Sequence, residues 1–127
     1  MKPFLLFTLP LLLAACVTTG TPGGSYPEGP ARIGQTVRVG GPTVRPLAVI
    51  EDSRCPTDVV CVWAGRVIVR AEVGTGQGVR EMQIELGQPV HVADGMLTLR
   101  QVTPAHRSSQ VVKPEDYRFT FEFAGGL

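Results

Sequence analysis

The sequence has few of the residues that most often carry metal or enzymatic chemistry. Its 127 residues include two His and three Cys. Neither His91 nor His106 has a His, Cys or carboxylate neighbour at the spacing of a zinc site, so we expect no metal and no cofactor. Charged residues make up 18% of the chain and the formal net charge is +1. The basic surface that neutralises nucleic-acid phosphates is therefore missing, and we expect no nucleic-acid partner.

Long helical patterns and catalytic motifs are also missing. No window after residue 16 repeats its apolar residues at the helical period, so we expect no long helix. The sequence contains neither a Gly-x-Ser-x-Gly elbow nor a phosphate-binding loop with its following Lys. We therefore assign no catalytic residue and expect a protein that is not an enzyme. A small hydrolase that uses Ser53 or His106 is the weakest alternative.

A short apolar run opens the chain. Lys2 supplies one positive charge, an apolar run covers residues 4–13, and small residues follow. This order is typical of an export signal, and the run is too short to span a membrane as a helix. We predict that residues 1–15 are a signal peptide.

The signal ends in Leu13-Ala14-Ala15-Cys16, which resembles the lipobox of bacterial lipoproteins at each position. The resemblance implies cleavage before Cys16 and a lipid on that cysteine, palmitate included, so that the membrane is a partner through the anchor. The next residue is Val17 and not Asp, which by the lipoprotein sorting pattern favours the outer membrane. The expected location is the bacterial cell envelope, facing the periplasm.

The segment after Cys16 has the composition of a tether. Residues 17–31 include four Gly and three Pro and almost no apolar side chain. Such a segment buries too little apolar surface to offset the entropy of folding. We predict a lipidated cysteine and flexible tether over residues 16–31 and one β-domain over residues 32–127.

Alternation of apolar and polar residues dominates the rest of the chain. It is clear over residues 66–73 and 117–123, as expected for half-buried antiparallel strands. Asp94-Gly95 is typical of a hairpin turn. Pro46 lies within another expected strand and favours an edge position or a bulge. We predict an all-β fold, either a compact antiparallel sandwich or a small barrel, with six to eight short strands.

Two cysteines remain once Cys16 is assigned to lipid. An even pair outside the cytoplasm is normally joined, and we predict a disulfide between Cys55 and Cys61. The bridge needs Cα atoms within about 7 Å of each other, hence a tight turn between them. Residues 56–58 suit such a turn.

The most distinctive motif is DSRCPTDVVCVWAG at residues 52–65. Its Asp-Ser-Arg-Cys-Pro start, second Cys, Trp and Gly resemble a signature of small bacterial lipoproteins of unknown function, and the resemblance implies no particular activity. The residues themselves indicate a disulfide-closed bend. We expect Trp63 to begin the next strand and to cover the sulfurs, and Gly65 to allow a bulge or a close backbone approach.

We expect a binding surface on either of two loops. One is the disulfide-closed bend, whose simplest interpretation is a structural staple and whose alternative is a recognition loop. The other is the long connection over residues 103–116. Arg54 has three expected roles, pairing with Asp52 or Asp58 or stacking on Trp63. The candidate binding residues are Asp52, Arg54, Asp58, Trp63, His106 and Arg107.

These features predict a lipid-anchored envelope lipoprotein with a non-enzymatic binding or structural role. Its expected partner, beyond the membrane, is an envelope protein. The alternative is an inhibitor of a periplasmic or extracellular hydrolase, since a preorganised loop binds at a lower entropy cost.

Overall fold

The described chain consists of β-strands joined by turns. The computed structural model describes residues 3, 10 and 25–125, so Cys16 and nearly all of the predicted signal peptide lie outside the described residues. A short 3₁₀ turn, η1 (Pro114–Asp116), precedes the last strand. Within the described ranges, no helix has both the length and the apolar character to cross a membrane. The strands are β1 (Val37–Arg38), β2 (Thr43–Asp52), β3 (Val67–Thr75), β4 (Gly78–Glu85), β5 (Val90–Val92), β6 (Gly95–Thr103) and β7 (Arg118–Gly125).

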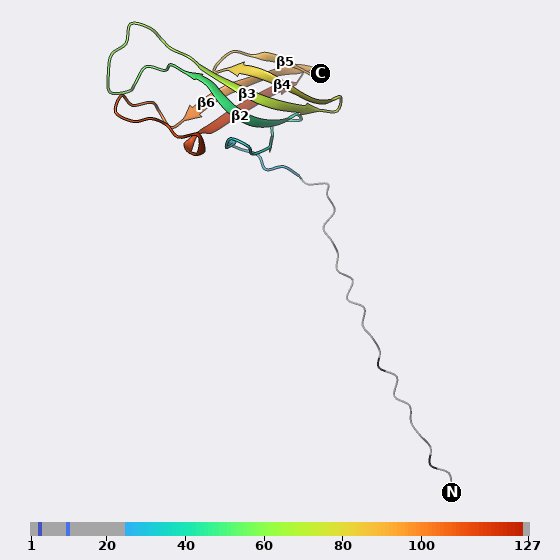
Figure 1. The fold of residues 1–127 in the computed structure, drawn as a ribbon. Coiled ribbons are helices and arrows are strands. Elements are labelled where there is room, and N and C mark those ends of the chain that lie inside the picture. The colour runs from blue at the N-terminus through green and yellow to red at the C-terminus, as the bar shows by residue number, and fades with distance from the viewer. Residues whose placement is uncertain (1–2, 4–9, 11–24, 126–127) are drawn as a thin grey trace.

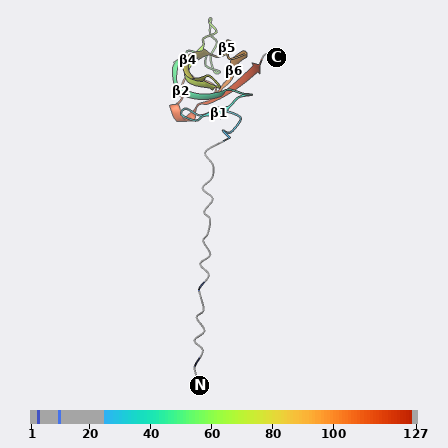
Figure 2. The same cartoon turned by 90° about the vertical axis from the view of Figure 1, so that its right-hand side faces the viewer.

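The seven strands form two antiparallel sheets. One sheet has the order β1-β2-β3-β4 and the other the order β5-β6-β7 (Figure 1). Seen after a quarter turn, β1 and β2 lie on one side of the domain and β5 and β6 on the other (Figure 2). The all-β prediction is confirmed, and of the two architectures expected the structure has the sandwich.

Alternating burial places one face of each sheet in the core. In β3, Val67, Val69, Ala71 and Val73 are buried whereas Arg70 between them is exposed. This is the pattern that a period of two produces when one sheet face packs and the other meets water. Facing residues complete the core, among them Val44, Ile84, Leu97, Leu99, Phe119 and Phe121.

β2 is irregular around its proline. Its pairing with β3 shifts register between Pro46 and Ala48, and again between Val49 and Glu51. The expected bulge follows Pro46, and the proline is also locally at an edge, because β1 pairs only with Thr43 and Val44 and ends before it. A residue without an amide hydrogen is tolerated there, since no ladder partner on that side needs its donor.

The expected hairpin at Asp94-Gly95 forms, but its turn lies earlier in the chain. Val92 pairs with Gly95, so Ala93 and Asp94 make the turn, and Ala93 has a φ of 50°. Gly95 belongs to β6, and a Cβ at this position would lie 2.2 Å from the carbonyl oxygen of Ala124. Close contact with β7, rather than turn geometry, requires glycine here.

Packing begins before residue 32, the predicted start of the domain. Ala31 is fully buried and exchanges two backbone hydrogen bonds with Phe119 of β7, at 2.8 and 2.9 Å. The carbonyl of Pro27 accepts a hydrogen bond from the amide of Arg38 in β1, at 2.9 Å. Residues 27–31 therefore belong to the folded domain and not to the tether, since their backbone joins both sheets.

Candidate functional site

Two loops meet at one end of the sandwich. Residues 53–66, here called the disulfide loop, connect β2 to β3, and residues 104–117, here called the long loop, connect β6 to β7. Figure 1 shows both loops projecting from the end opposite the β3–β4 turn. The amide of Thr57 donates a hydrogen bond to the carbonyl of His106 at 2.9 Å. The two candidate binding segments thus form one continuous surface.

The neck of the disulfide loop is closed by Ser53 and Arg66. The Ser53 amide donates to the Arg66 carbonyl at 2.8 Å, and the Arg66 amide donates to the Ser53 hydroxyl oxygen at 3.0 Å. Gly65 has a φ of 67°, and a Cβ there would lie 1.9 Å from the Ser53 carbonyl oxygen. The close backbone approach expected at Gly65 is therefore confirmed, and only glycine fits this neck.

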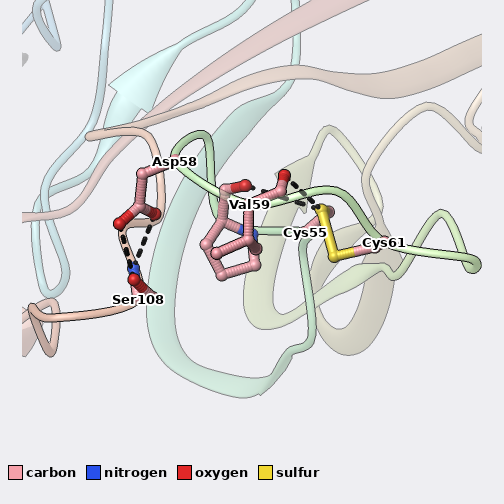
Figure 3. Close-up of a disulfide and its surroundings, with 6 residues drawn as sticks. Cys55, Asp58, Val59, Cys61 and Ser108 are labelled. Carbon is pink, nitrogen blue, oxygen red and sulfur yellow. Dashed lines mark hydrogen bonds between the residues drawn. A yellow bond between two sulfur atoms is a disulfide. The ribbon is translucent and has the colours of Figure 1, made fainter.

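The predicted disulfide between Cys55 and Cys61 is confirmed. The two Cα atoms are 5.8 Å apart and the bond closes a short segment of chain. Figure 3 shows it beside Val59, whose carbonyl oxygen lies 3.6 Å from the Cys55 sulfur. The bond restricts the part of the loop that extends furthest from the strands.

Asp58 ties the disulfide loop to the long loop. Its Oδ1 accepts a hydrogen bond from the Ser108 amide at 3.0 Å, and its Oδ2 accepts one from the Ser108 hydroxyl at 2.5 Å (Figure 3). The hydroxyl and then the amide of Ser108 lower the pKa of Asp58 below its ordinary value. The carboxylate is thus used in joining the loops.

A polar network lies beneath the disulfide loop. Arg54 donates from Nε and Nη2 to both oxygens of Asp52 at 2.8 Å, and from Nη1 to the carbonyl of Val102 at 2.9 Å. The hydroxyl of Tyr117 donates to Oδ2 of Asp52 at 2.7 Å. The side chains of Arg54 and Asp52 are only 16% and 10% exposed. The bidentate pair, with its additional partners, fixes the loop base to β6 and to the residue before β7.

The protonation of this network follows from its contacts. Burial raises the pKa of Asp52, but the hydrogen bonds from Arg54 and Tyr117 outweigh burial and hold the pKa below its ordinary value of 3.8. The hydrogen bond to Asp52 raises the pKa of Arg54. Burial, followed by the hydrogen bond to Asp52, raises the pKa of Tyr117 to about 12. At neutral pH the network holds one carboxylate, one guanidinium and one neutral phenol.

The far end of the disulfide loop is apolar and exposed. Val60 is 100% exposed, Val62 is 97% exposed and Trp63 is 62% exposed, while Val59 beside them is 45% exposed. We call these four residues the apolar tip. Large apolar side chains of a folded domain are more often buried, so four exposed ones within five residues of chain are unusual.

Two of the six candidate binding residues lie in the partly buried polar network, and the other four lie on the two loops. Asp52 and Arg54 are partly buried and bind each other, so of the three roles expected for Arg54 the pairing with Asp52 is found. The others lie on the loops, as Asp58, Trp63, His106 and Arg107. His106 contacts the disulfide loop through its carbonyl, and its Nδ1 is buried without a hydrogen-bond partner in the described part of the chain.

The expectation that Trp63 begins the next strand is wrong. The residue lies before β3, which starts at Val67, and it is largely exposed. Val60 and Val62 as surface residues, and Ser108 as the partner of Asp58, are not expected from the sequence. The signal that was available is the run Val59-Val60-Cys61-Val62-Trp63, which has no alternating polar residues and so fits neither face of a half-buried strand.

Ser53 and His106, the residues considered for a small hydrolase, lie on different loops. The Ser53 hydroxyl is engaged with Arg66, and within residues 25–125 no hydrogen bond joins it to His106. Over the same residues, no group of three or more His, Cys, Asp and Glu is placed to hold a metal ion. The chemistry that the arrangement offers is contact through apolar side chains and backbone groups.

Comparisons with known proteins assign no relative to this chain. It matches no family model, no curated protein and no solved structure. A functional assignment therefore depends on the geometry of the disulfide loop and on the N-terminal motif.

Proposed function

We propose that this chain is a lipid-anchored lipoprotein of the bacterial envelope that binds a protein partner through the apolar tip and is not an enzyme. The observation that carries the proposal is the exposure of Val60 and Val62 on a closed loop. Burying one such side chain against a partner contributes about 1.5–3 kcal/mol. A loop that is already restrained loses little further entropy on binding.

A purely structural role for the bend accounts for its base but not for its tip. Asp52, Arg54 and Tyr117 are satisfied within the domain and stabilise it. Val60 and Val62 contribute no burial to the fold, and a polar residue would serve equally well at either position in an isolated domain. Binding of another protein to the tip would explain why these apolar side chains are exposed.

The course of the chain supports anchoring at the end opposite the tip. Tyr26 lines a hollow with Thr43, where β2 begins, and Gly74, near the end of β3. The disulfide loop follows Asp52 at the other end of β2, whose ten residues span roughly 33 Å at about 3.3 Å each. A lipid on Cys16, in the outer membrane and facing the periplasm, is thus compatible with a tip directed away from that membrane.

The anchor is tested on the protein purified from its native membrane. Mass spectrometry is expected to find a chain that begins at Cys16 and carries acyl groups. The Cys16→Ser variant should lose the acyl mass and leave the membrane fraction. A native chain that retains residues 1–15, or an unmodified Cys16, contradicts the anchor.

Binding is tested with the full-length lipoprotein in detergent. We expect it to capture a stoichiometric protein from envelope extract, and Val60→Asp or Val62→Asp to abolish capture without lowering the melting temperature. Val79→Asp is the matched control, because Val79 is 68% exposed on β4. Equal capture by the tip variants and wild type, or no capture by wild type, contradicts binding through the tip.

A further inference from the structure

The backbone of residues 60–65, which include most of the apolar tip, forms no hydrogen bond within the described chain. The strands on either side are paired up to the start of the loop, where Asp52 of β2 pairs with Val67 of β3. Residues 60–65 therefore offer free donors and acceptors beside exposed apolar side chains.

Apolar side chains next to free backbone groups are the recognition features of a peptide substrate. Clefts that bind peptides pair with the main chain and take alternate side chains into pockets. Here the disulfide and the link from Asp58 to Ser108 hold the segment in place before binding, which lowers the cost of ordering. A flat protein surface that contacted only the apolar side chains would leave these backbone groups without hydrogen bonds.

The charge around the tip favours a protein cleft over a lipid surface. From Cys55 to Gly65 the only charged residue is Asp58, and it is occupied by Ser108. Arg54 and Arg66, which flank this segment, are paired with Asp52 and Glu51, and Arg107 of the long loop is close enough to Asp58 to help lower its pKa. A loop that inserts into an anionic membrane surface is normally accompanied by free Lys or Arg.

We infer, on the basis of the proposed function, that the partner is a peptidase and that residues 60–65 occupy its substrate cleft. The cleft has pockets for a branched aliphatic or an aromatic side chain, which receive Val62 or Trp63. Backbone groups of the cleft walls pair with the free amides and carbonyls of the segment. The lipoprotein then acts as a competitive, non-covalent inhibitor of that enzyme.

The inference is tested by placing the photo-crosslinker p-benzoylphenylalanine at position 62 of the full chain in its native cells. Irradiation is expected to give an adduct whose partner peptide comes from the wall of a peptidase substrate cleft. The same crosslinker at position 79, on β4, gives no such adduct. The full wild-type chain should raise the KM of the captured enzyme for a fluorogenic Val-Trp peptide and leave kcat unchanged.

The matched variants separate this inference from the proposed function. Val62→Asp should weaken inhibition at least about tenfold, whereas Val79→Asp should leave it unchanged. Adducts to lipid acyl chains, or to a protein surface outside a substrate cleft, overturn the inference. If the tip-dependent protein is captured but its peptidase activity is unaffected, the inference fails and the binding function stands. If neither capture nor an adduct is found, both fail.

Discussion

At the scale of single residues, Arg54 shows how one side chain connects three segments of the chain. Its planar guanidinium matches the two oxygens of Asp52 and has a further N–H for the carbonyl of Val102. Tyr117, the residue before β7, adds a further hydrogen bond to Asp52. Each polar group thereby offsets the cost of burying the next.

Replacing Tyr117 with Phe removes the hydroxyl and keeps the ring. Because the folded-state pKa of about 12 lies above the ordinary 10.0, the protonated phenol stabilises the fold fully below pH 10.0, and this contribution is lost as the pH rises through about 12. We expect Tyr117→Phe to lower the free energy of unfolding by about 1 kcal/mol at neutral pH. Urea unfolding at a series of pH values measures this change.

The same titrations show whether Tyr117 causes the alkaline loss of stability. The wild-type protein should lose stability between pH 10.0 and about 12, and the Phe variant should lose less. An equally steep decline in both proteins assigns the loss to another group.

At the scale of elements, the disulfide loop depends on its neck as much as on its disulfide. Ser53 and Arg66 continue the pairing of β2 and β3 beyond the last ladder pair, Asp52 with Val67. Gly65 lets the chain turn out of this neck without contact with the Ser53 carbonyl. The path of the loop is therefore set where it leaves the sheet.

Gly65→Ala should disrupt this element. A methyl group at 1.9 Å from a backbone oxygen, in a left-handed conformation, forces the neck to open, and we expect a loss of about 3 kcal/mol or more in the free energy of unfolding. Gly76→Ala in the β3–β4 turn is the control, because a Cβ there has no neighbour within 4 Å. Its effect should stay within about 0.5 kcal/mol. Equal unfolding midpoints for the two variants would show that the neck tolerates a side chain.

At the scale of the whole molecule, the core and the proposed binding surface occupy different parts of the chain. The two sheets enclose the apolar core, with Phe119, Leu97 and Leu99 fully buried. The loops at the end of the sandwich contribute polar contacts between themselves and present Val60 and Val62 to solvent. Such a rigid scaffold lets a loop vary in sequence without loss of the fold.

Paired alanine substitutions test this separation. Phe119→Ala should cost about 3–5 kcal/mol of stability, because it leaves a cavity between the sheets. Val60→Ala should change stability by less than about 0.5 kcal/mol, because the side chain is fully exposed. Guanidinium unfolding of both proteins gives the two values. A large loss in Val60→Ala would mean that the tip packs against the domain in solution.

Most of the fold was accessible from the sequence because strand formation and alternation are local. The alternation over residues 66–73 and 117–123 predicts β3 and β7, and Pro46 predicts an irregularity in β2, as a bulge or an edge position. The turn of the β5–β6 hairpin was misplaced, because Gly95 is required by its contact with Ala124 of β7. A contact between distant residues is not visible in a local pattern.

The sequence by itself determined the strand pattern, the cysteine pairing and the turn-rich segments between strands, since each depends on neighbouring residues and on the number of cysteines. Only the tertiary structure decided that Arg54 pairs with Asp52, that Asp58 joins Ser108 and that Trp63 stays in solvent. These outcomes depend on how β2 and β6 bring their following loops together. Burial and partner choice are properties of that assembled end of the sandwich, and local sequence does not encode them.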